Sequence, residues 1–242
     1  MNDSAPLLSV EGVHAGYGAS DILHGIDLEV RSGELVCVIG PNGAGKSTVF
    51  KAVFGLIPVR KGVVRFDGDV INNSTPQQTL AAGMAIVPQL RSVFPQMTVA
   101  ENLEMGMYLE RDSARVKRRI DEVFDLFPRL RERAQQKVGT MSGGEQRMLE
   151  IGRSLMLEPK LVLMDEPSAG LAPSITRTIF RHIRDLNSQM GLTVLMIEQN
   201  ARQGLETSDR GYVLELGVNT YSGSGQELID DPDVRRAFLG VR

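Results

Sequence analysis

A glycine-rich stretch has the residue types and the spacing needed to hold a triphosphate, namely Gly40-Pro41-Asn42-Gly43-Ala44-Gly45-Lys46-Ser47 followed by Thr48. It fits the pattern G-x-x-x-x-G-K-[ST] and lies between an apolar run and a candidate helix. Glycine permits the left-handed backbone angles that let successive N–H groups surround a phosphate at a helix start. Lys46 is expected to reach the β- and γ-phosphates, and Ser47 to ligate Mg²⁺. A plain glycine turn with an exposed lysine is the alternative.

Two carboxylates follow a second apolar run at residues 161–164. A phosphate-binding loop needs a further metal anchor on a neighbouring strand, so we expect Asp165 to hold Mg²⁺ through water. Glu166 comes next and is expected to polarise the attacking water as general base. A second structural anion is the alternative for Glu166. These features fit an ATPase or a kinase.

A third stretch, Met141-Ser142-Gly143-Gly144-Glu145-Gln146-Arg147, separates these classes. A serine and two glycines at the start of a helix make a second anion-binding site. One chain needs only one such site for one triphosphate, so the second site requires its own explanation.

Apolar and alternating segments predict the strands that must position these residues. The expected strands are 7–13, 22–30, 34–39, 84–87, 161–164, 192–197 and 211–216, with a hairpin-like segment at 63–68. Helices are expected from the glycine loop to about residue 54 and over 173–189, and the middle, 98–155, reads as helical almost throughout. Thr98 and Glu101 form a capping box at its start. The two ends of the chain are therefore expected to share one sheet-and-helix body, with the helical middle inserted.

Composition limits the class of protein. The chain has 242 residues, 42% of them hydrophobic, with 27 Lys and Arg against 30 Asp and Glu. This near balance gives no electrostatic footprint for nucleic acid. The single cysteine, Cys37, lies in an apolar run and reads as a small buried hydrophobe, with a catalytic thiol as the alternative. No stretch approaches the ~20 apolar residues of a membrane span, so we expect a cytosolic protein that could dock on a membrane protein.

With the phosphate loop, the stretch beginning at Met141 and the strand ending in Asp165 in this arrangement, the sequence resembles the ATP-binding cassette (ABC) ATPases of transporters over essentially the whole chain. The resemblance implies an α/β fold: a P-loop NTPase (RecA-like) core with an N-terminal antiparallel β subdomain and an inserted α-helical signature subdomain. It implies a single domain over residues 1–242, with the core at 1–95 and 156–242 and the helical insert at 96–155.

The resemblance also explains the second anion site. It implies ATP as the nucleotide and head-to-tail pairing of two such subunits. The signature residues of one chain, Ser142, Gly143, Gly144 and Glu145, then cover the γ-phosphate bound by Lys46 of the other.

Three further site residues follow from the resemblance. Tyr17 matches the ring that stacks on adenine, with plain packing as the alternative. Gln89 matches the glutamine that touches Mg²⁺ and senses the membrane partner, with a polar strand end as the alternative. Gln199 stands in the switch position, where most ABC ATPases have a histidine contacting the γ-phosphate. An amide cannot carry a proton charge as histidine can, so acid–base work is expected to fall to Glu166.

The sequence departs from the family pattern at three other positions. Met141 replaces the usual leucine and Glu145 the usual glutamine, and both changes lie outside the Ser-Gly-Gly stretch. Ala172 stands where many relatives have an aspartate that communicates across the dimer. Coupling through that aspartate is therefore expected to be absent.

Four segments look like one branch of the family, the smaller ATPase subunit of branched-chain (hydrophobic) amino-acid importers, with urea and amide importers close to it. They are Glu198-Gln199-Asn200, Ala172-Pro173, residues 93–103 and residues 231–240. The resemblance implies a second ABC ATPase subunit, as a heterodimer or homodimer, two integral membrane permease subunits and an external substrate-binding protein. It places the chain peripherally on the cytoplasmic face of the inner or plasma membrane.

Two other functions are alternatives for a chain with this phosphate loop and signature. A lipopolysaccharide-type exporter ATPase shares the short loop after Asp165 but normally keeps the switch histidine, so Gln199 argues against it. A soluble, non-transport ABC ATPase acting on ribosomes or DNA usually has two cassettes or a long coiled-coil insert. This chain has one phosphate loop and an insert of ordinary length.

Overall fold

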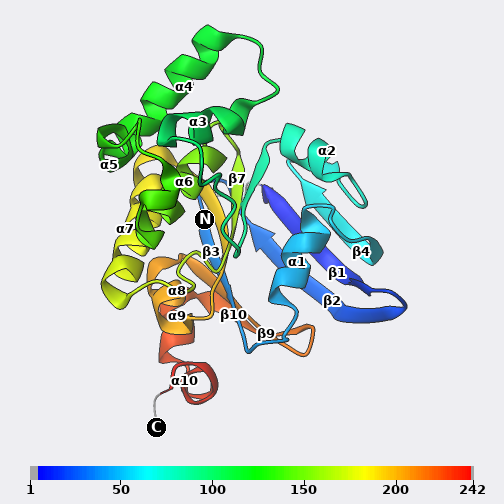
Figure 1. The fold of residues 1–242 in the computed structure, drawn as a ribbon. Helices are drawn as coiled ribbons and strands as arrows, with labels where there is room; N and C mark the ends of the chain where they lie inside the picture. Colours follow the sequence, from blue (N-terminus) through cyan, green and yellow to red (C-terminus); the bar gives the residue numbers. More distant parts are fainter. Residues whose placement is uncertain (1–4, 241–242) are drawn as a thin grey trace.

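Two sheets form the body of the protein, whose structure is a computed structural model that describes residues 5–240 (Figure 1). The larger sheet has the strand order β10-β9-β3-β8-β7-β6. Its strands are β3 (Leu35–Ile39), β6 (Met84–Val87), β7 (Leu161–Asp165), β8 (Thr193–Ile197), β9 (Arg210–Glu215) and β10 (Val218–Ser224). Pairing is parallel from β9 through β6, and β10 is antiparallel to β9. The expected α/β core is confirmed.

The smaller sheet is antiparallel, with the order β2-β1-β4-β5. Its strands are β1 (Leu8–Tyr17), β2 (Ser20–Val30), β4 (Val59–Phe66) and β5 (Asp69–Val70). The first two strands run further than the expected 7–13 and 22–30. The register of β1 against β2 shifts between Val10 and Val13. This irregularity interrupts the alternation of apolar and polar residues on which the predicted strand lengths rest. This sheet is the predicted N-terminal β subdomain.

Alternate residues of the central strands enter two different cores. Val36 and Val38 pack with the antiparallel sheet and α1 (Lys46–Val53), whereas Leu35, Cys37 and Ile39 pack with the helices on the other face. A parallel strand buried on both faces reads as a continuous apolar run, as residues 35–39 do. Cys37 is fully buried, and burial, followed by the charge of Glu198, raises its thiol pKa well above the ordinary value. This agrees with its interpretation as a small hydrophobe.

The middle of the chain is less helical than expected. It contains α3 (Val99–Glu104), η1 (Met105–Met107), α4 (Ser113–Leu126), α5 (Pro128–Glu132), η2 (Val138–Thr140) and α6 (Gly143–Ser154), with irregular segments between them. Phe127 leaves the helical region because Pro128 follows it. The capping box of Thr98 and Glu101 is present as predicted. The prediction of nearly continuous helix over 98–155 was therefore wrong in extent.

The remaining helices complete the layer that includes α6. They are α7 (Pro173–Met190), α8 (Ala201–Thr207), α9 (Gly225–Asp230) and α10 (Pro232–Phe238), while α2 (Pro76–Ala81) lies beside the antiparallel sheet (Figure 1). Gly191 ends α7 in a left-handed conformation with φ of 67°. Within residues 5–240, no helix is both long and apolar enough to cross a membrane.

Candidate active site

The topology gathers the predicted site residues at one edge of the large sheet. Strand β8 lies between β3 and β7, and Ile197 is level with both Val38 and Asp165. Parallel strands place their carboxyl ends together, so the segments that follow β3, β6, β7 and β8 meet there. These segments carry Gly40, Gln89 and Glu166, and the switch stretch that follows Ile197. This edge, at the carboxyl ends of the strands, is where open α/β sheets bind ligands.

The phosphate loop needs glycine for two separate reasons. Gly40, Gly43 and Gly45 have φ of 152°, 84° and 99°, angles that side chains rarely adopt. In addition, a Cβ at Gly40 would lie 2.2 Å from the carbonyl oxygen of Leu214, and one at Gly45 would lie 2.8 Å from Cδ2 of Leu23. At Gly43 no atom lies within 4 Å of such a Cβ, so this side of the loop is open. The loop is thus packed against Leu214 and Leu23 on one side and is open at Gly43.

Lys46 holds the loop closed from within. Its Nζ donates to the carbonyl oxygens of Gly40 at 2.8 Å and Pro41 at 3.0 Å. Burial lowers the pKa of Lys46, and the carboxylates of Glu166 and Asp165 oppose this shift. An ammonium has three donors, so one N–H remains for an anion at the open side of the loop.

Ser47 and Asp165 face one another across the site, as a shared metal ligand pair requires. The Ser47 hydroxyl donates to Oδ1 of Asp165 at 3.2 Å. Burial raises the pKa of Asp165, and the Ser47 hydrogen bond opposes the shift. Within residues 5–240 there is no cluster of three or more His, Cys, Asp and Glu side chains suited to a metal. A hydroxyl and one carboxylate fit Mg²⁺, which usually completes its shell with water and substrate phosphates.

Glu166 is buried and tightly held. It is 8% exposed and adopts φ of 46°, a left-handed conformation that is costly for a residue with a side chain. Its N–H donates to the carbonyl oxygen of Ile197 at 2.9 Å, and the Gln89 amide donates to its Oε2 at 2.7 Å. The structure therefore brings two predicted site residues into direct contact and leaves Oε1 of Glu166 free of that bond.

Arg147 fixes the backbone of the segment that carries Gln89. Its guanidinium, on α6, donates to the carbonyl oxygens of Pro88 at 2.8 Å and Gln89 at 2.9 Å. Arg147 also forms a buried ion pair of 3.0 Å with Glu150. Sequence reasoning did not assign Arg147 a role, because its partners are backbone atoms about sixty residues away in the chain. The end of β6 and the signature helix are thus directly joined.

Glu198 is a second residue that sequence reasoning missed. The carboxylate is 1% exposed and accepts four hydrogen bonds from two loops. Ser168 donates through N–H at 3.1 Å and Oγ at 3.0 Å, and the N–H groups of Gln199 and Asn200 donate at 3.1 and 3.3 Å. Burial raises the pKa of Glu198 against these bonds. The signal was its position at the end of an apolar strand, where a buried acid must find donors.

Gln199 and Tyr17 lie at the surface of this site region. The Gln199 side chain is exposed directly after the β8 strand. Tyr17 ends β1 and is 45% exposed, and its hydroxyl accepts a hydrogen bond of 3.0 Å from Lys51 on α1. The Lys51 ammonium lies 5.4 Å from the Tyr17 ring centre. The ring is therefore anchored beside the helix that follows the phosphate loop, which is compatible with the predicted stacking but also with simple packing.

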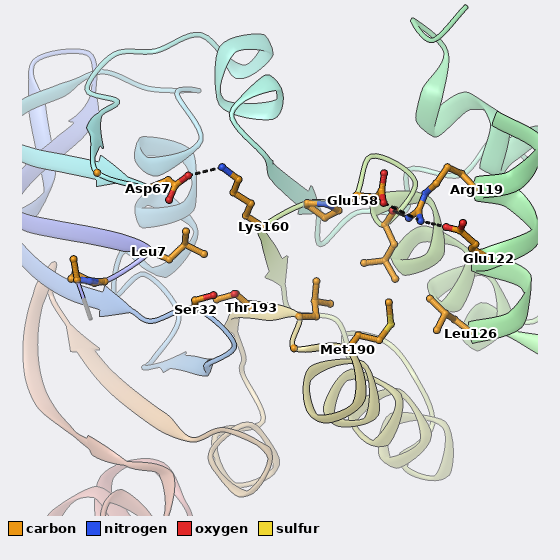
Figure 2. Close-up of a pocket in the computed structure, with 17 residues that line it drawn as sticks. Leu7, Ser32, Asp67, Arg119, Glu122, Leu126, Glu158, Lys160, Met190 and Thr193 are labelled. Carbon is orange, nitrogen blue, oxygen red and sulfur yellow. Dashed lines mark hydrogen bonds and ion pairs between the residues drawn. The ribbon is translucent and has the colours of Figure 1, made fainter. Parts of the chain in front are cut away.

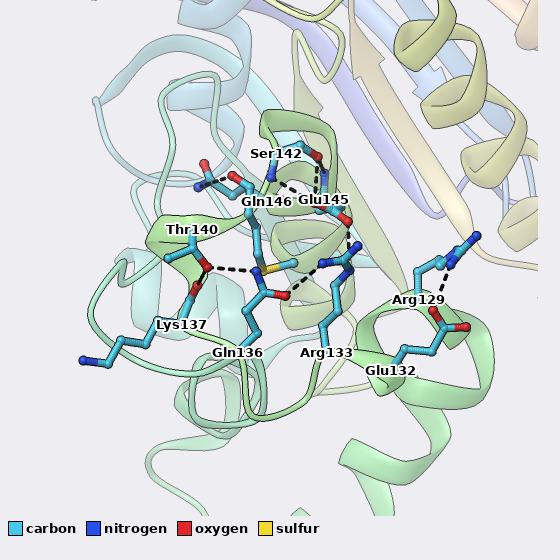
Figure 3. Close-up of polar contacts among 10 residues, drawn as sticks. Arg129, Glu132, Arg133, Gln136, Lys137, Thr140, Ser142, Glu145 and Gln146 are labelled. Carbon is cyan, nitrogen blue, oxygen red and sulfur yellow. Dashed lines mark hydrogen bonds and ion pairs between the residues drawn. The ribbon is translucent and has the colours of Figure 1, made fainter.

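The signature residues form the start of α6. Ser142 is its N-cap, and Ser142 and Glu145 make a reciprocal capping box (Figure 3). Added Cβ atoms would meet Nη2 of Arg91 at 2.6 Å from Gly143, and Cγ2 of Ile175 at 2.4 Å from Gly144. A side chain at Gly143 would therefore have to displace the end of the flexible Arg91 side chain, and one at Gly144 would have to displace the Ile175 side chain.

A cavity of about 860 Å³ lies elsewhere (Figure 2). Ser32, Lys160 and Thr193, which line it, lie at the amino ends of β3, β7 and β8. Two ion pairs, of Lys160 with Asp67 and of Arg119 with Glu158, join residues that line it. The cavity is therefore at the opposite edge of the sheet from the phosphate loop.

The fold and this edge define a class of protein. A largely parallel sheet with a glycine loop between β3 and α1, and a carboxylate at the end of β7, has the P-loop nucleoside triphosphatase architecture. The sequence profile of the family described as ABC transporter matches residues 23–169, more than half of the chain.

Relatives extend this likeness over the full length. The chain is 45% identical to the high-affinity branched-chain amino acid transport ATP-binding protein BraG of Pseudomonas aeruginosa, covering 97% of this chain and 100% of BraG. It is 34% identical to the lipopolysaccharide export system ATP-binding protein LptB of Haemophilus influenzae, over 97% of each. A crystal structure of the ADP conformation of an ATP-binding cassette of an ABC transporter matches with a TM-score of 0.86 at 29% identity, covering 98% of this chain and 100% of that chain.

The chain therefore belongs to the ABC transporter family. It is an ATP-binding ATPase subunit, and the expected resemblance to that family is confirmed.

Proposed function

We propose that this chain is the ATPase subunit of an ABC importer for branched-chain or other hydrophobic amino acids. The observation that carries the proposal is the 45% identity to BraG over essentially both full lengths. The Glu198-Gln199-Asn200 stretch and the Ala172-Pro173 stretch, on which the same branch was predicted, support it.

The proposed assembly contains a second ABC ATPase subunit and two membrane permease subunits, fed by an external substrate-binding protein. The chain works peripherally on the cytoplasmic face of the membrane. A head-to-tail pair, hetero- or homodimeric, gives Ser142, Gly143 and Gly144 an anion to bind, because the phosphate loop of the same chain already has Lys46. ATP-driven closure of this pair powers the permease.

In the proposed reaction, Ser47, Asp165 and Gln89 would hold Mg²⁺, which would supply positive charge to offset the charge developing on the transferred phosphoryl group. Residues 40–48 bind and orient the phosphates. Glu166 accepts a proton from the attacking water, and Gln89 fixes the orientation of that carboxylate through the 2.7 Å bond to Oε2. Gln199 hydrogen-bonds the γ-phosphate without changing its own charge.

The loop after β6 is the proposed contact with the permease. Leu90 directly follows Gln89 and is 81% exposed, and Phe94, four residues further along the same loop, is 42% exposed. Asn102 holds the Phe94 backbone through bonds of 2.8 and 3.0 Å, so the ring is presented from a fixed loop. Phe94→Ala is expected to weaken complex assembly and transport-coupled ATPase, with Val70→Ala, another exposed apolar side chain, as control. Wild-type levels of both in Phe94→Ala contradict this contact.

Transport measured in proteoliposomes tests the substrate class. The ATPase is reconstituted with its permease and external binding protein, and ATP-dependent uptake of radiolabelled leucine is compared with that of urea. Leucine uptake, lost in the Lys46→Ala variant, is the expected result. Urea uptake without leucine uptake transfers the proposal to the urea and amide importers.

Lipopolysaccharide export is the second candidate, supported by the 34% identity to LptB. Gln199 argues against this candidate, because lipopolysaccharide-type exporter ATPases normally keep a histidine at the switch position. ATP-dependent release of lipopolysaccharide from proteoliposomes, without leucine uptake, would favour this candidate instead. Failure of both, with ATPase activity intact in the isolated chain, would favour a soluble, non-transport role.

A further inference from the structure

Ser142, the signature residue proposed to bind phosphate, is already hydrogen-bonded within its own helix. The Ser142 hydroxyl and the Ser142 N–H both donate to Oε2 of Glu145, at 2.8 and 2.9 Å (Figure 3). To reach a phosphate, the hydroxyl must turn away from that carboxylate. Glu145, three residues after Ser142, then remains as an anion near the bound phosphate, and the two like charges repel.

A guanidinium takes the other oxygen of this carboxylate. Nε of Arg133 lies 3.0 Å from Oε1 of Glu145 in an ion pair that lacks hydrogen-bond geometry, so the Arg133 charge and the Ser142 hydrogen bonds act on opposite oxygens. Burial opposes ionisation, yet the hydrogen bonds from Ser142 and the charges of Arg133 and Arg129 keep the pKa of Glu145 below its ordinary value. The carboxylate is therefore ionised at neutral pH, and the nearest charge that offsets it is Arg133.

A directional chain of hydrogen bonds fixes the Arg133 side chain. The Thr140 hydroxyl donates to the carbonyl oxygen of Lys137 at 2.8 Å, which leaves its oxygen to accept from Nε2 of Gln136 at 2.8 Å. Because Nε2 of Gln136 points to Thr140, its Oε1 faces Arg133, whose Nη1 donates to it at 2.9 Å. The segment between α5 and α6 thus orients the Arg133 guanidinium toward Glu145 (Figure 3).

We propose that Arg133 is a positioning residue for the signature: it holds and neutralises Glu145, so that the Ser142 hydroxyl can exchange Oε2 for the γ-phosphate of the paired chain. The inference rests on the head-to-tail pairing in the proposed function. The exchange replaces one charged acceptor of the hydroxyl by another, so it costs little hydrogen-bond energy. Its cost lies in the charge left on Glu145, which Arg133 offsets.

ATP-dependent dimerisation of the full chain tests this role. In a Glu166→Gln background, sedimentation velocity gives the MgATP concentration for half-maximal dimer. Arg133→Gln is expected to raise that concentration about tenfold, because an uncompensated carboxylate faces the phosphate. The double variant Arg133→Gln/Glu145→Gln is expected to return to within about twofold of the background chain, since the charge needing compensation is gone.

Arg131→Gln is the matched control. Arg131 lies in the last turn of α5, two residues before Arg133, and pairs with Asp125 at 3.0 Å, so its replacement is expected to leave dimerisation unchanged. Binding of a fluorescent ATP analogue to the monomer is also expected to be unchanged in Arg133→Gln, because Arg133 acts on the nucleotide of the paired chain.

The possible results separate this inference from the function on which it rests. Dimerisation of Arg133→Gln at the background concentration overturns the inference alone. So does weakened dimerisation that the double variant fails to restore, since that marks a purely structural effect. A background chain that binds the analogue but forms no dimer at any MgATP concentration, either alone or mixed with the second ATPase subunit, overturns the proposed pairing, and the inference with it.

Discussion

The side-chain amide of Gln89 donates a hydrogen bond of 2.7 Å to Oε2 of Glu166, joining the end of β6 to the end of β7. Arg147, on α6, holds the backbone carbonyl of Gln89 at 2.9 Å. The proposed general base is therefore two hydrogen-bonded contacts away from the signature helix. A displacement of that helix relative to β7 must strain or break the bond that orients the carboxylate.

Reversing the polarity of this contact is expected to reduce turnover. In Gln89→Glu a second carboxylate replaces the donor, and two carboxylates in contact disfavour the ionised form of the base. We expect kcat for ATP hydrolysis to fall about tenfold or more, measured as phosphate release at saturating ATP. Gln96→Glu, an exposed position in the same loop, is the control and is expected to keep wild-type kcat. An equal kcat in both variants contradicts the orienting role of Gln89.

Removing the proposed base separates binding from turnover. Glu166→Gln keeps an acceptor for the Gln89 amide but cannot take a proton from water. We expect unchanged ATP affinity, a loss of hydrolysis of about a hundredfold or more, and a longer-lived ATP dimer. Equilibrium titration, phosphate release and sedimentation measure the three quantities. Wild-type hydrolysis in the assembled complex excludes Glu166 as the base, and Glu104→Gln at the surface controls for loss of a carboxylate.

The parts of this site that could be predicted from sequence are those encoded locally. Residues 40–48 combine glycine, lysine and serine at fixed spacing between a strand and a helix, and the structure has β3 and α1 on either side. Asp165 is the last residue of β7, after the apolar run 161–164, and Glu166 follows the strand. Parallel pairing then brings these ends together, so the convergence at one edge follows from strand order.

The parts that could not be predicted depend on partners far along the chain. Glu198 binds Ser168, thirty residues away, and its role follows only from that contact. The exchange of glutamine for Glu145 looked minor because the compensating Arg133 has no pattern that marks it. The middle of the chain looked continuously helical because apolar spacing persists through segments whose backbone hydrogen bonds go elsewhere, as where Val99 N–H donates to Gln136.

Lys46→Ala is expected to weaken nucleotide binding itself. The variant loses the charge that faces the phosphates and also the two bonds, to Gly40 and Pro41, that close the loop. We expect ATP affinity to fall about tenfold or more in a direct titration. Lys61→Ala, an exposed lysine on β4, is the control. Wild-type affinity in Lys46→Ala, with a normal melting temperature, contradicts the assignment of residues 40–48.

The buried carboxyl of Glu198 gives a prediction on stability and pH. Its pKa is raised above the ordinary value of 4.5, so the folded state retains a proton that the unfolded state has lost. Its contribution to the free energy of unfolding is therefore fully present below 4.5 and is lost as pH rises through the folded pKa.

Glu198→Gln removes this pH-dependent contribution. The free energy of unfolding of the variant, minus that of the wild type, is expected to increase with pH above about 4.5, as measured by urea denaturation. Glu101 provides a control of opposite sign, because hydrogen bonds from Thr98 lower its pKa. For Glu101→Gln the same difference should decrease with rising pH, on the acid side of 4.5. A flat difference for Glu198→Gln shows that burial does not govern this carboxyl.

A histidine at the switch position should add a titration that the wild type lacks. The Gln199 amide carries no proton charge in the range of ATPase assays, whereas histidine titrates at about pH 6.5. If Gln199 faces the γ-phosphate, protonated histidine attracts it, so the KM for ATP of Gln199→His is expected to fall below about pH 6.5. Gln226→His, exposed on α9, controls for an added histidine away from the site. Steady-state ATPase profiles between about pH 5.5 and 8.5 provide the measurement. Identical profiles for Gln199→His and the wild type make position 199 a spacer, and the loop that Glu198 holds then serves only to shape the end of β8.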